Sequence, residues 1–189
     1  MELMMGVFSA FGLSASAGLN AYIPLLAVAL LGRFTNLIEL KQPWDALTNW
    51  WVIGTLVVLS IIEFFADKVP AVNHINDIFQ TFIRPAAGAI LFAASAKVVS
   101  DVHPIFAMVL GVLVAGSVHA VKSVAIRPAV TATTGGTANV PVSIAEDVVS
   151  TVMSVVSVVL PALVVLMAIL FVSWIIWLMW RRVNRATRT

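Results

Sequence analysis

The chain has 189 residues, of which 61% are hydrophobic and 11% are charged, and its formal net charge is +2. Charged residues make up about a quarter of a typical soluble domain, so this composition excludes a soluble globular protein and indicates an integral membrane protein. Because the chain contains no cysteine, disulfides, thiolate metal sites, iron–sulfur clusters and a thiol nucleophile are excluded as well.

The length and hydropathy predict one all-α transmembrane domain over residues 1–189, a polytopic helix bundle with five or six hydrophobic segments. The first residues include an acid and lack the basic stretch of a signal peptide, so we expect the first helix to be retained. The expected parts, in chain order, are segment 3–32, an interfacial loop at 33–49, and segments 50–65, 71–99, 104–124 and 141–180.

The first segment is interrupted where it should cross the middle of the membrane. Residues 12–24 read GLSASAGLNAYIP, and glycine, serine, asparagine and proline all weaken a helix. One interpretation is a broken or re-entrant pair of half-helices near 14–20, with Asn20 at the break. The other is a continuous helix whose small residues permit close packing against a neighbour.

The second and third segments carry polar side chains on defined faces. Glu63 and Asp67 are four residues apart and share a helix face. Farther along, polar residues recur every three or four positions and form one stripe of an α-helix. They are Asn73, Asp77, Gln80 and Arg84. Since hydrocarbon does not solvate such a stripe, we expect it, together with the neighbouring His74, to face protein or water.

Residues 117–147 join two apolar helices through a stretch that is rich in proline, glycine and threonine. Small residues at every fourth position upstream, at 107, 111 and 115, let helix backbones approach closely. The stretch also carries six polar or charged residues, which are His119, Lys122, Arg127, Asn139, Glu146 and Asp147. Unwound backbone flanked by charge is tolerated in lipid only where protein or water surrounds it. We therefore expect a second broken or re-entrant helix near 127–140, and a functional site there.

The last hydrophobic segment is too long for a single pass. Forty helical residues extend about 60 Å, roughly twice the hydrocarbon thickness. We therefore expect either two passes or one pass with a half-helix or an overhang, with the joint at Pro161. Serines at 150, 154 and 157 lie on one stripe with Asp147, so a polar side of this helix should face inward. Residues 181–189 contain four arginines and follow tryptophans at 174, 177 and 180, which is typical of the cytoplasmic end of a membrane helix. We therefore expect the inner (cytoplasmic) membrane, with the C-terminus on the cytoplasmic side.

The tetrapeptide IRPA occurs twice, at 83–86 and at 126–129. Proline is favoured in the first turn of a helix, where free N–H groups and the helix dipole attract anions. Each Arg-Pro step therefore predicts a helix start that can hold an anion through Arg84 or Arg127. The alternative is that both arginines pair with acids of the chain, since charges buried in a membrane are costly.

Three stretches of the chain are distinctive. They read SAGLNAYIPLL, EFFADKVPAVNHINDIFQTFIRPAAGA and HAVKSVAIRPAVTATTGGTANVPVSIAED. They resemble the signature segments of a bacterial integral membrane family catalogued only as a domain of unknown function, over the chain up to about Pro161. That family commonly has an acid where this chain has Asn73, and an Asn-Pro dipeptide where it has Asn139, Val140 and Pro141. The resemblance implies a single domain of packed membrane helices and supplies no activity.

The leading functional hypothesis is a small membrane transporter or lipid flippase for an anionic or amphiphilic substrate, coupled to protons. The residues expected to bind the substrate are Arg84, Arg127, Lys122, Asn20, Asn139 and His119. The residues expected to exchange protons are Glu63, Asp67, Asp77, His74, Glu146 and Asp147. Membrane lipids and a second copy of the chain are the expected partners.

Two alternatives remain. A channel, or an assembly subunit of a membrane complex, would also suit the small-residue repeats. An intramembrane enzyme would use either Lys122 and Arg127-Pro128, which faintly resemble the first motif of membrane phosphatidate phosphatases at a shorter spacing, or a metal held by the acids and His74. We expect no enzymatic activity and no catalytic residue, metal or cofactor, because the nucleophile and acid motifs of those phosphatases and the nucleotide fingerprints are missing. We also expect no nucleic-acid partner, because the basic residues lie within the membrane segments or in the anchor tail.

Overall fold

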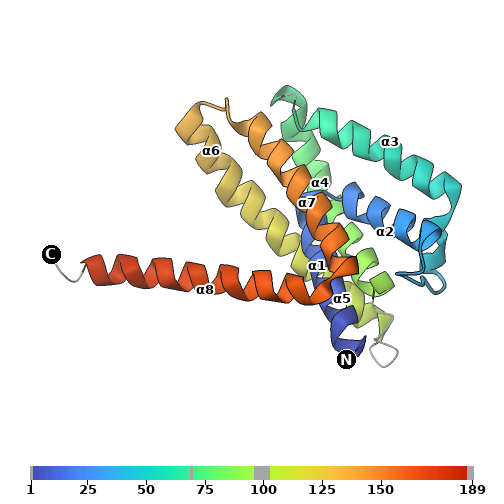
Figure 1. Ribbon diagram of the computed structural model, residues 1–189. Helices are drawn as coiled ribbons and strands as arrows, with labels where there is room; N and C mark the ends of the chain where they lie inside the picture. The colour runs from blue at the N-terminus through green and yellow to red at the C-terminus, as the bar shows by residue number, and fades with distance from the viewer. Residues whose placement is uncertain (1, 69, 96–102, 187–189) are drawn as a thin grey trace.

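The computed structural model describes residues 2–68, 70–95 and 103–186, and this part of the chain is helical without any strand. The elements in chain order are α1 (Glu2–Leu19), α2 (Tyr22–Phe34), the 3₁₀-helix η1 (Trp44–Thr48), α3 (Trp50–Ala66), α4 (Pro70–Ser95), α5 (Pro104–Ala120), the π-helix η2 (Val121–Ile126), α6 (Arg127–Thr134), α7 (Asn139–Val159) and α8 (Pro161–Ala186). Figure 1 shows α1, α4, α5 and α7 side by side, with α2 and α3 along one flank of this group. The predicted all-α bundle is confirmed.

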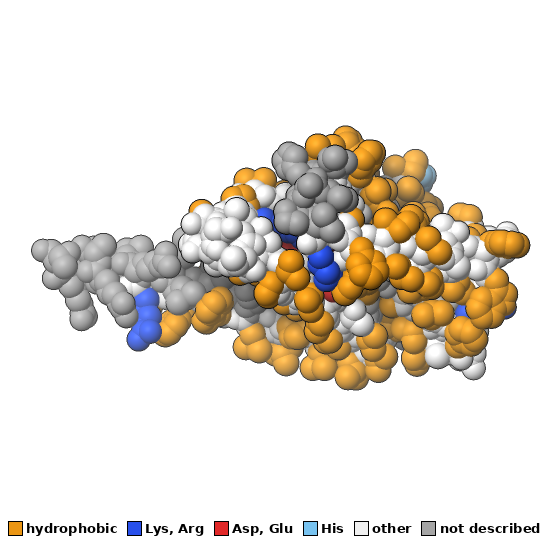
Figure 2. All heavy atoms as spheres, turned by 90° about the horizontal axis from the view of Figure 1, so that it is seen from above, with side chains coloured by type: hydrophobic (Ala, Val, Ile, Leu, Met, Phe, Trp, Pro, Cys, Tyr) orange, Lys and Arg blue, Asp and Glu red, His pale blue; other side chains and the backbone are white. Residues whose placement is uncertain are grey.

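Within the described residues, three helical segments are long and apolar enough to cross a membrane. They are Asn76–Ser95, Pro104–Thr134 and Asn139–Val159, of 20, 31 and 21 residues. About 20 helical residues span the hydrocarbon core, so each of these segments suffices for one pass. Shorter apolar helices accompany them at Met4–Leu19, Tyr22–Phe34 and Trp50–Ala66. Seen from above, hydrophobic side chains form most of the described surface, and charged atoms are visible over small areas only (Figure 2). The chain thus has the character of a membrane protein.

The first predicted interruption is a break between two helices. α1 ends at Leu19 and α2 begins at Tyr22. The side-chain oxygen of Asn20 accepts hydrogen bonds from the backbone N–H groups of Tyr22 and Ile23, both at 3.1 Å, and so caps the start of α2. The interpretation of two half-helices is therefore correct, and the break lies at Asn20 and Ala21. Their re-entrant path stays a prediction.

The second interruption is shorter than predicted and begins later. α5, η2 and α6 follow one another without a gap from Pro104 to Thr134. Only residues 135–138 leave the helix, and Gly135 ends α6 with a left-handed φ of 61°, a conformation that glycine adopts without steric cost. The helical backbone therefore continues through residues 127–134, where the sequence predicts unwinding.

The two Arg-Pro steps do not begin helices with free N–H groups, as the sequence predicts. Arg84 and Pro85 lie in the interior of α4. Arg127 follows the π-helix directly, and its backbone N–H donates to the carbonyl of Lys122. Because proline lacks a donor, Pro85 costs α4 one hydrogen bond but does not end the helix. Arg84 is therefore not at a helix start, and the start of α6 at Arg127 continues from the π-helix without a gap. Binding of an anion by the two arginines stays a prediction.

Close packing of α4 against α5 depends on small residues. Ala107, Gly111 and Ala115 are all buried, with His119 on the same face of α5. A methyl group at Gly111 would collide with the carbonyl oxygen of Gly88 and would lie 2.7 Å from the Cα of Ala89. The two backbones are thus in direct contact, as the four-residue repeat predicts.

Serine side chains join α1 to α7. The hydroxyl of Ser16 lies 2.9 Å from that of Ser150 and 2.8 Å from that of Ser154, and all three residues are buried. The predicted inward polar stripe of the last segment is therefore present. The joint at Pro161 is confirmed too, because α7 ends at Val159 and α8 begins at Pro161. From there α8 runs away from the other helices (Figure 1).

Candidate functional site

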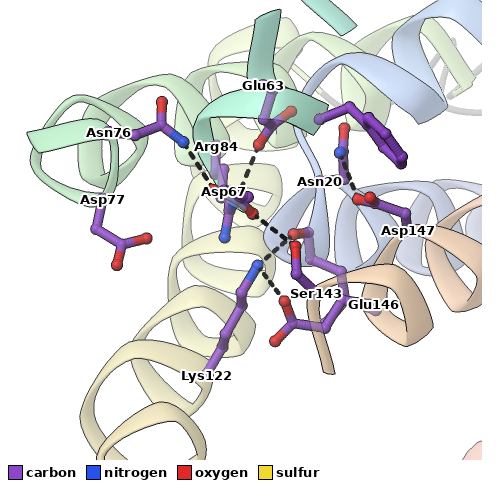
Figure 3. A network of polar contacts seen from close by, with 12 residues as sticks. Asn20, Glu63, Asp67, Asn76, Asp77, Arg84, Lys122, Ser143, Glu146 and Asp147 are labelled. Atoms are coloured by element: carbon purple, nitrogen blue, oxygen red, sulfur yellow. Dashed lines mark hydrogen bonds and ion pairs between the residues drawn. The ribbon is translucent and has the colours of Figure 1, made fainter. Parts of the chain in front are cut away.

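A cluster of charged side chains lies among α3, α4, η2, α6 and α7 (Figure 3). We call it the charge cluster, and it comprises Glu63, Asp67, Lys68, Asp77, Arg84, His119, Lys122, Arg127, Glu146 and Asp147. Most residues that the sequence nominated for a site are in it. The cluster holds five carboxylates and four cations, so it has one negative charge in excess when all of them are ionised and His119 is neutral.

Arg84 is at the centre of the charge cluster and is fully buried in α4. Its Nη2 atom donates to Glu63 Oε1 at 2.9 Å and lies 4.0 Å from Asp67 Oδ2. Its Nη1 atom lies 3.2 Å from Nδ1 of His119. Gln80, one turn earlier in α4, is also buried, so this part of the predicted polar stripe faces protein, while the side chain of Asn73 lies outside the described residues. Arg84 therefore pairs with an acid of the chain, which was the alternative to anion binding.

The tautomer of His119 follows from its two neighbours. Arginine donates hydrogen bonds and cannot accept them, so Nδ1 of His119 must accept from Arg84. On the other side of the ring, Nε2 lies 3.2 Å from the hydroxyl of Thr81, which already donates to the carbonyl of Asp77 at 2.8 Å. The Thr81 oxygen must then accept, so Nε2 carries the hydrogen. A neutral His119 thus orients Arg84.

Asp67 connects four helices. Its Oδ2 atom accepts from Arg127 at 3.0 Å and from the Ser143 hydroxyl at 3.3 Å, and its Oδ1 atom accepts from Asn76 at 2.8 Å. Charge-assisted hydrogen bonds of this kind are about twice as strong as neutral ones. Asp67 therefore ties the end of α3 to α4, α6 and α7.

One carboxylate oxygen of Glu146 forms ion pairs with two cations. Lys122 Nζ lies 2.8 Å from Glu146 Oε2, and Arg127 Nη2 lies 3.1 Å from the same atom. Lys122 also donates to the backbone carbonyl of Leu19, the last residue of α1, at 2.9 Å. That carbonyl lies at the negative end of the α1 dipole, where a cation is stabilising. The carbonyl at the break between α1 and α2 is thus one of the hydrogen-bond acceptors of Lys122.

Asp147 and Asn20 link α7 to the same break. The Asn20 amide donates to Asp147 Oδ1 at 2.9 Å, and Lys68 Nζ lies 3.7 Å from Asp147 Oδ2. Asn20 is 2% exposed, and both ends of its amide group are used. The predicted site residue Asn20 therefore joins the charge cluster through Asp147.

We expect Asn20→Asp to lower the free energy of unfolding by about 1–3 kcal/mol. The aspartate keeps the acceptor that caps α2, but it replaces the donor to Asp147 with a second carboxylate. Asn20→Ser is the matched control, because serine also caps helices and brings no charge. Reversible unfolding in mixed micelles measures both changes. Equal losses for the two variants would contradict the assigned bond to Asp147.

Four carboxylates of the charge cluster each have one buried oxygen that forms no hydrogen bond within the part of the chain that the structure describes. These atoms are Glu63 Oε2, Asp77 Oδ1, Glu146 Oε1 and Asp147 Oδ2. An unpaired acceptor removed from water costs about 1–3 kcal/mol, and more when it is charged. These oxygens are therefore positions where a proton, a water molecule or a ligand donor would be stabilised.

A cavity of about 350 Å³ adjoins the charge cluster between α2, α3 and α7. Its polar lining consists of Asn20, Ser60 and Asp147, and the rest is apolar, including Phe64 and Phe65. The hydroxyl of Ser60 is buried and forms no hydrogen bond. The cavity thus combines apolar walls with polar atoms that form no hydrogen bond, which is the usual composition of a small-molecule site.

Two nominated residues are not part of this arrangement. Asn139 exchanges hydrogen bonds with Thr131 across the turn from α6 to α7, away from the charge cluster. The side chain of His74 lies outside the described residues. Conversely, Asn76, Ser143 and Ser60 were not singled out from the sequence. Of these three, only Ser143 could have been predicted from the sequence, because it lies four residues before Asp147 and extends the polar stripe of α7 by one position.

No group of three or more histidine and acidic side chains converges on a possible metal position within residues 2–68, 70–95 and 103–186. Glu63, Asp67 and Glu146 point instead at arginine and lysine nitrogens (Figure 3).

Comparison with known proteins identifies one family. Residues 7–181 match a family described as a domain of unknown function (DUF4126). No curated protein and no solved structure matches the chain.

Proposed function

Since the chain belongs to the DUF4126 family, whose function is unknown, we propose from its site that it is a small transporter or lipid flippase for an amphiphilic substrate, coupled to protons. The sequence also suggested an anionic substrate. Arg84, Lys122 and Arg127, the residues nominated to hold it, each lie within 3.1 Å of a carboxylate oxygen. The cluster already has an excess of acids, so the amphiphilic hypothesis has the stronger support.

The observation that carries the proposal is a cavity beside carboxylate oxygens that have no hydrogen bond. Asp147 belongs to both the cavity lining and the charge cluster. Ionisable groups inside membrane segments are costly, and they usually mark substrate or proton pathways. A ligand in the cavity and a proton in the cluster would therefore act on the same helix, α7.

Proton coupling would work through the ion pairs of α7. Protonation of Glu146 removes the negative charge that holds Lys122 and Arg127, at 2.8 and 3.1 Å. Without that charge the two cations repel each other, and the contact of α7 with η2 and α6 weakens. A change in the position of α7 would then alter the cavity, since Asp147 is the next residue. The four unpaired oxygens supply the places where such a proton could bind.

We place the protein in the bacterial inner membrane with a cytoplasmic C-terminus, and membrane lipids as its surroundings. The support is the basic tail after the tryptophans of α8. Assembly with a second copy of the chain is proposed for α8, whose side chains Leu166, Leu170 and Trp174 are more than 49% exposed. This exposed helix is also what would favour the alternative function, a subunit of a membrane complex.

The test is a transport assay in proteoliposomes with three fluorescent lipids that share one tail and carry an anionic, a zwitterionic or a cationic head. We expect protein-dependent movement of at least one lipid across the bilayer, faster with an imposed pH gradient. Glu146→Gln should reduce the effect of the gradient about tenfold, because glutamine cannot gain or lose a proton. Asp45→Asn, at an exposed position of η1, is the matched control.

Movement equal to that in protein-free liposomes, for all three lipids, would reject the transporter and leave the channel or subunit as the candidate. A gradient effect that survives in Glu146→Gln would reject the coupling route through Glu146.

A further inference from the structure

We infer that the cavity between α2, α3 and α7 is a binding site for an amphiphile whose head is a protonated amine. The inference deepens the proposed function, on which it rests for the idea that an amphiphile is moved, by naming the class of head group. The binding itself is argued from the residues that line the cavity.

The unsatisfied polar atoms of the residues that line the cavity call for a hydrogen-bond donor. Asp147 Oδ2 forms no hydrogen bond, and its other oxygen is used by Asn20. The Ser60 hydroxyl, also without a partner, lines the same cavity. Asn20 offers nothing further, because its oxygen caps α2 and its nitrogen donates to Asp147. A carboxylate with an open acceptor site attracts an ammonium group and repels an anionic head.

The apolar walls reach the surface that faces lipid. Ile61, Phe64 and Phe65 line the cavity and are 52%, 40% and 62% exposed. In a membrane, this side of α3 would contact acyl chains. A ligand could therefore place its head at Asp147 while its tail remains among the apolar side chains and the lipid.

The position of Lys68 shows that an alkylammonium group can be accommodated beside Phe64 and Asp147. Its Nζ atom lies 3.1 Å from the centre of the Phe64 ring and 3.7 Å from Asp147 Oδ2. A cation over an aromatic face is stabilised electrostatically, more strongly where water is excluded. The side chain of Lys68 is itself an alkylammonium, anchored to the carbonyl of Phe64 at 2.8 Å. The amine of a ligand would either compete with Lys68 for Asp147 or bind beside Lys68, at the lone pairs of Asp147 Oδ2 that accept no hydrogen bond.

The test is calorimetric titration of the full chain in maltoside micelles with octylammonium, octanol and octanoate. We expect saturable binding of octylammonium, and binding of the other two probes to be at least about tenfold weaker. Asp147→Asn keeps the shape of the side chain and should weaken octylammonium binding about tenfold. Ile61→Trp should abolish it by filling the cavity. Val58→Trp is the matched control, because Val58 lies on the same helix, is 56% exposed and does not line the cavity.

Lys68→Met separates a binding role of the cavity from a general loss of structure. Methionine keeps an apolar stem and removes the competing ammonium, so octylammonium should bind several-fold more tightly.

Equal binding of octanoate and octylammonium would overturn the inference, and so would normal octylammonium binding by Ile61→Trp. Binding without any lipid movement in proteoliposomes would keep the site and reject the transporter. Lipid movement without octylammonium binding would do the reverse.

Discussion

Replacing Arg84 with methionine is expected to lower the free energy of unfolding by about 3–5 kcal/mol, because it leaves a buried acid without its counter-charge. Arg84 and Glu63 have side chains that are 0% and 1% exposed, and their closest atoms are 2.9 Å apart. The other carboxylate oxygen of Glu63 is buried and forms no hydrogen bond with the described residues, so Arg84 is the main compensation of its charge. Unfolding by denaturant in mixed micelles measures the loss.

Two further variants test this explanation. The double variant Arg84→Met and Glu63→Met should recover most of the lost stability, since replacing a buried pair with apolar side chains is often neutral. Arg33→Met is the control at an exposed arginine, which donates to the carbonyl of Thr48, and should cost less than about 1 kcal/mol. An Arg84→Met loss no larger than that of Arg33→Met would contradict a buried pair.

The stability of the double variant also separates folding from function. If the pair of Arg84 and Glu63 only holds α3 to α4, lipid movement should recover together with stability. If Glu63 also exchanges protons, the double variant should be stable and should lack the response to a pH gradient.

Gly111→Ala is expected to destabilise the protein by about 1–3 kcal/mol, through overpacking at the contact of α4 with α5. The added methyl group would meet the backbone of Gly88 and Ala89, with the Cα of Ala89 at 2.7 Å. Backbone cannot rotate away as a side chain can, so the two helices must separate. The opposite replacement, Gly88→Ala, would meet the carbonyl of Gly111 at 2.7 Å and should have a similar effect.

Gly116→Ala is the matched control on the same helix. There the nearest atom to the added carbon is Pro85 Cγ at 3.8 Å, an ordinary contact distance. Alanine favours a helix interior over glycine by about 1 kcal/mol in solution, so this variant should be neutral or slightly more stable. Unfolding midpoints of the variants, compared with wild type, test the pair. A loss at Gly116→Ala equal to that at Gly111→Ala would mean that glycine flexibility, rather than close approach, is required in α5.

Composition and local spacing were enough to predict several features of this chain. Hydropathy alone identifies the membrane helices, because hydrocarbon demands long apolar segments whose backbone is bonded internally. Residues three or four apart share a helix face in any helix, so the small-residue face of α5 and the serine stripe of α7 could be read directly. The breaks at Asn20 and after Thr134 could be predicted too, from glycine, asparagine and proline.

Which charges meet, and whether the helix breaks at each proline, could not be predicted from local patterns. Arg84 and Arg127 carry the same tetrapeptide, yet one bonds Glu63 and the other bonds Asp67 and Glu146, acids that lie 19 to 60 residues away in the chain. Such pairing depends on how the helices pack, which local spacing does not encode. The helix also continues through both Arg-Pro steps, since a proline removes only a single backbone hydrogen bond. The cavity beside Asp147 has the same origin: it exists because α3 meets α2 and α7 at the break of the first segment, a contact between parts of the chain that no local pattern connects.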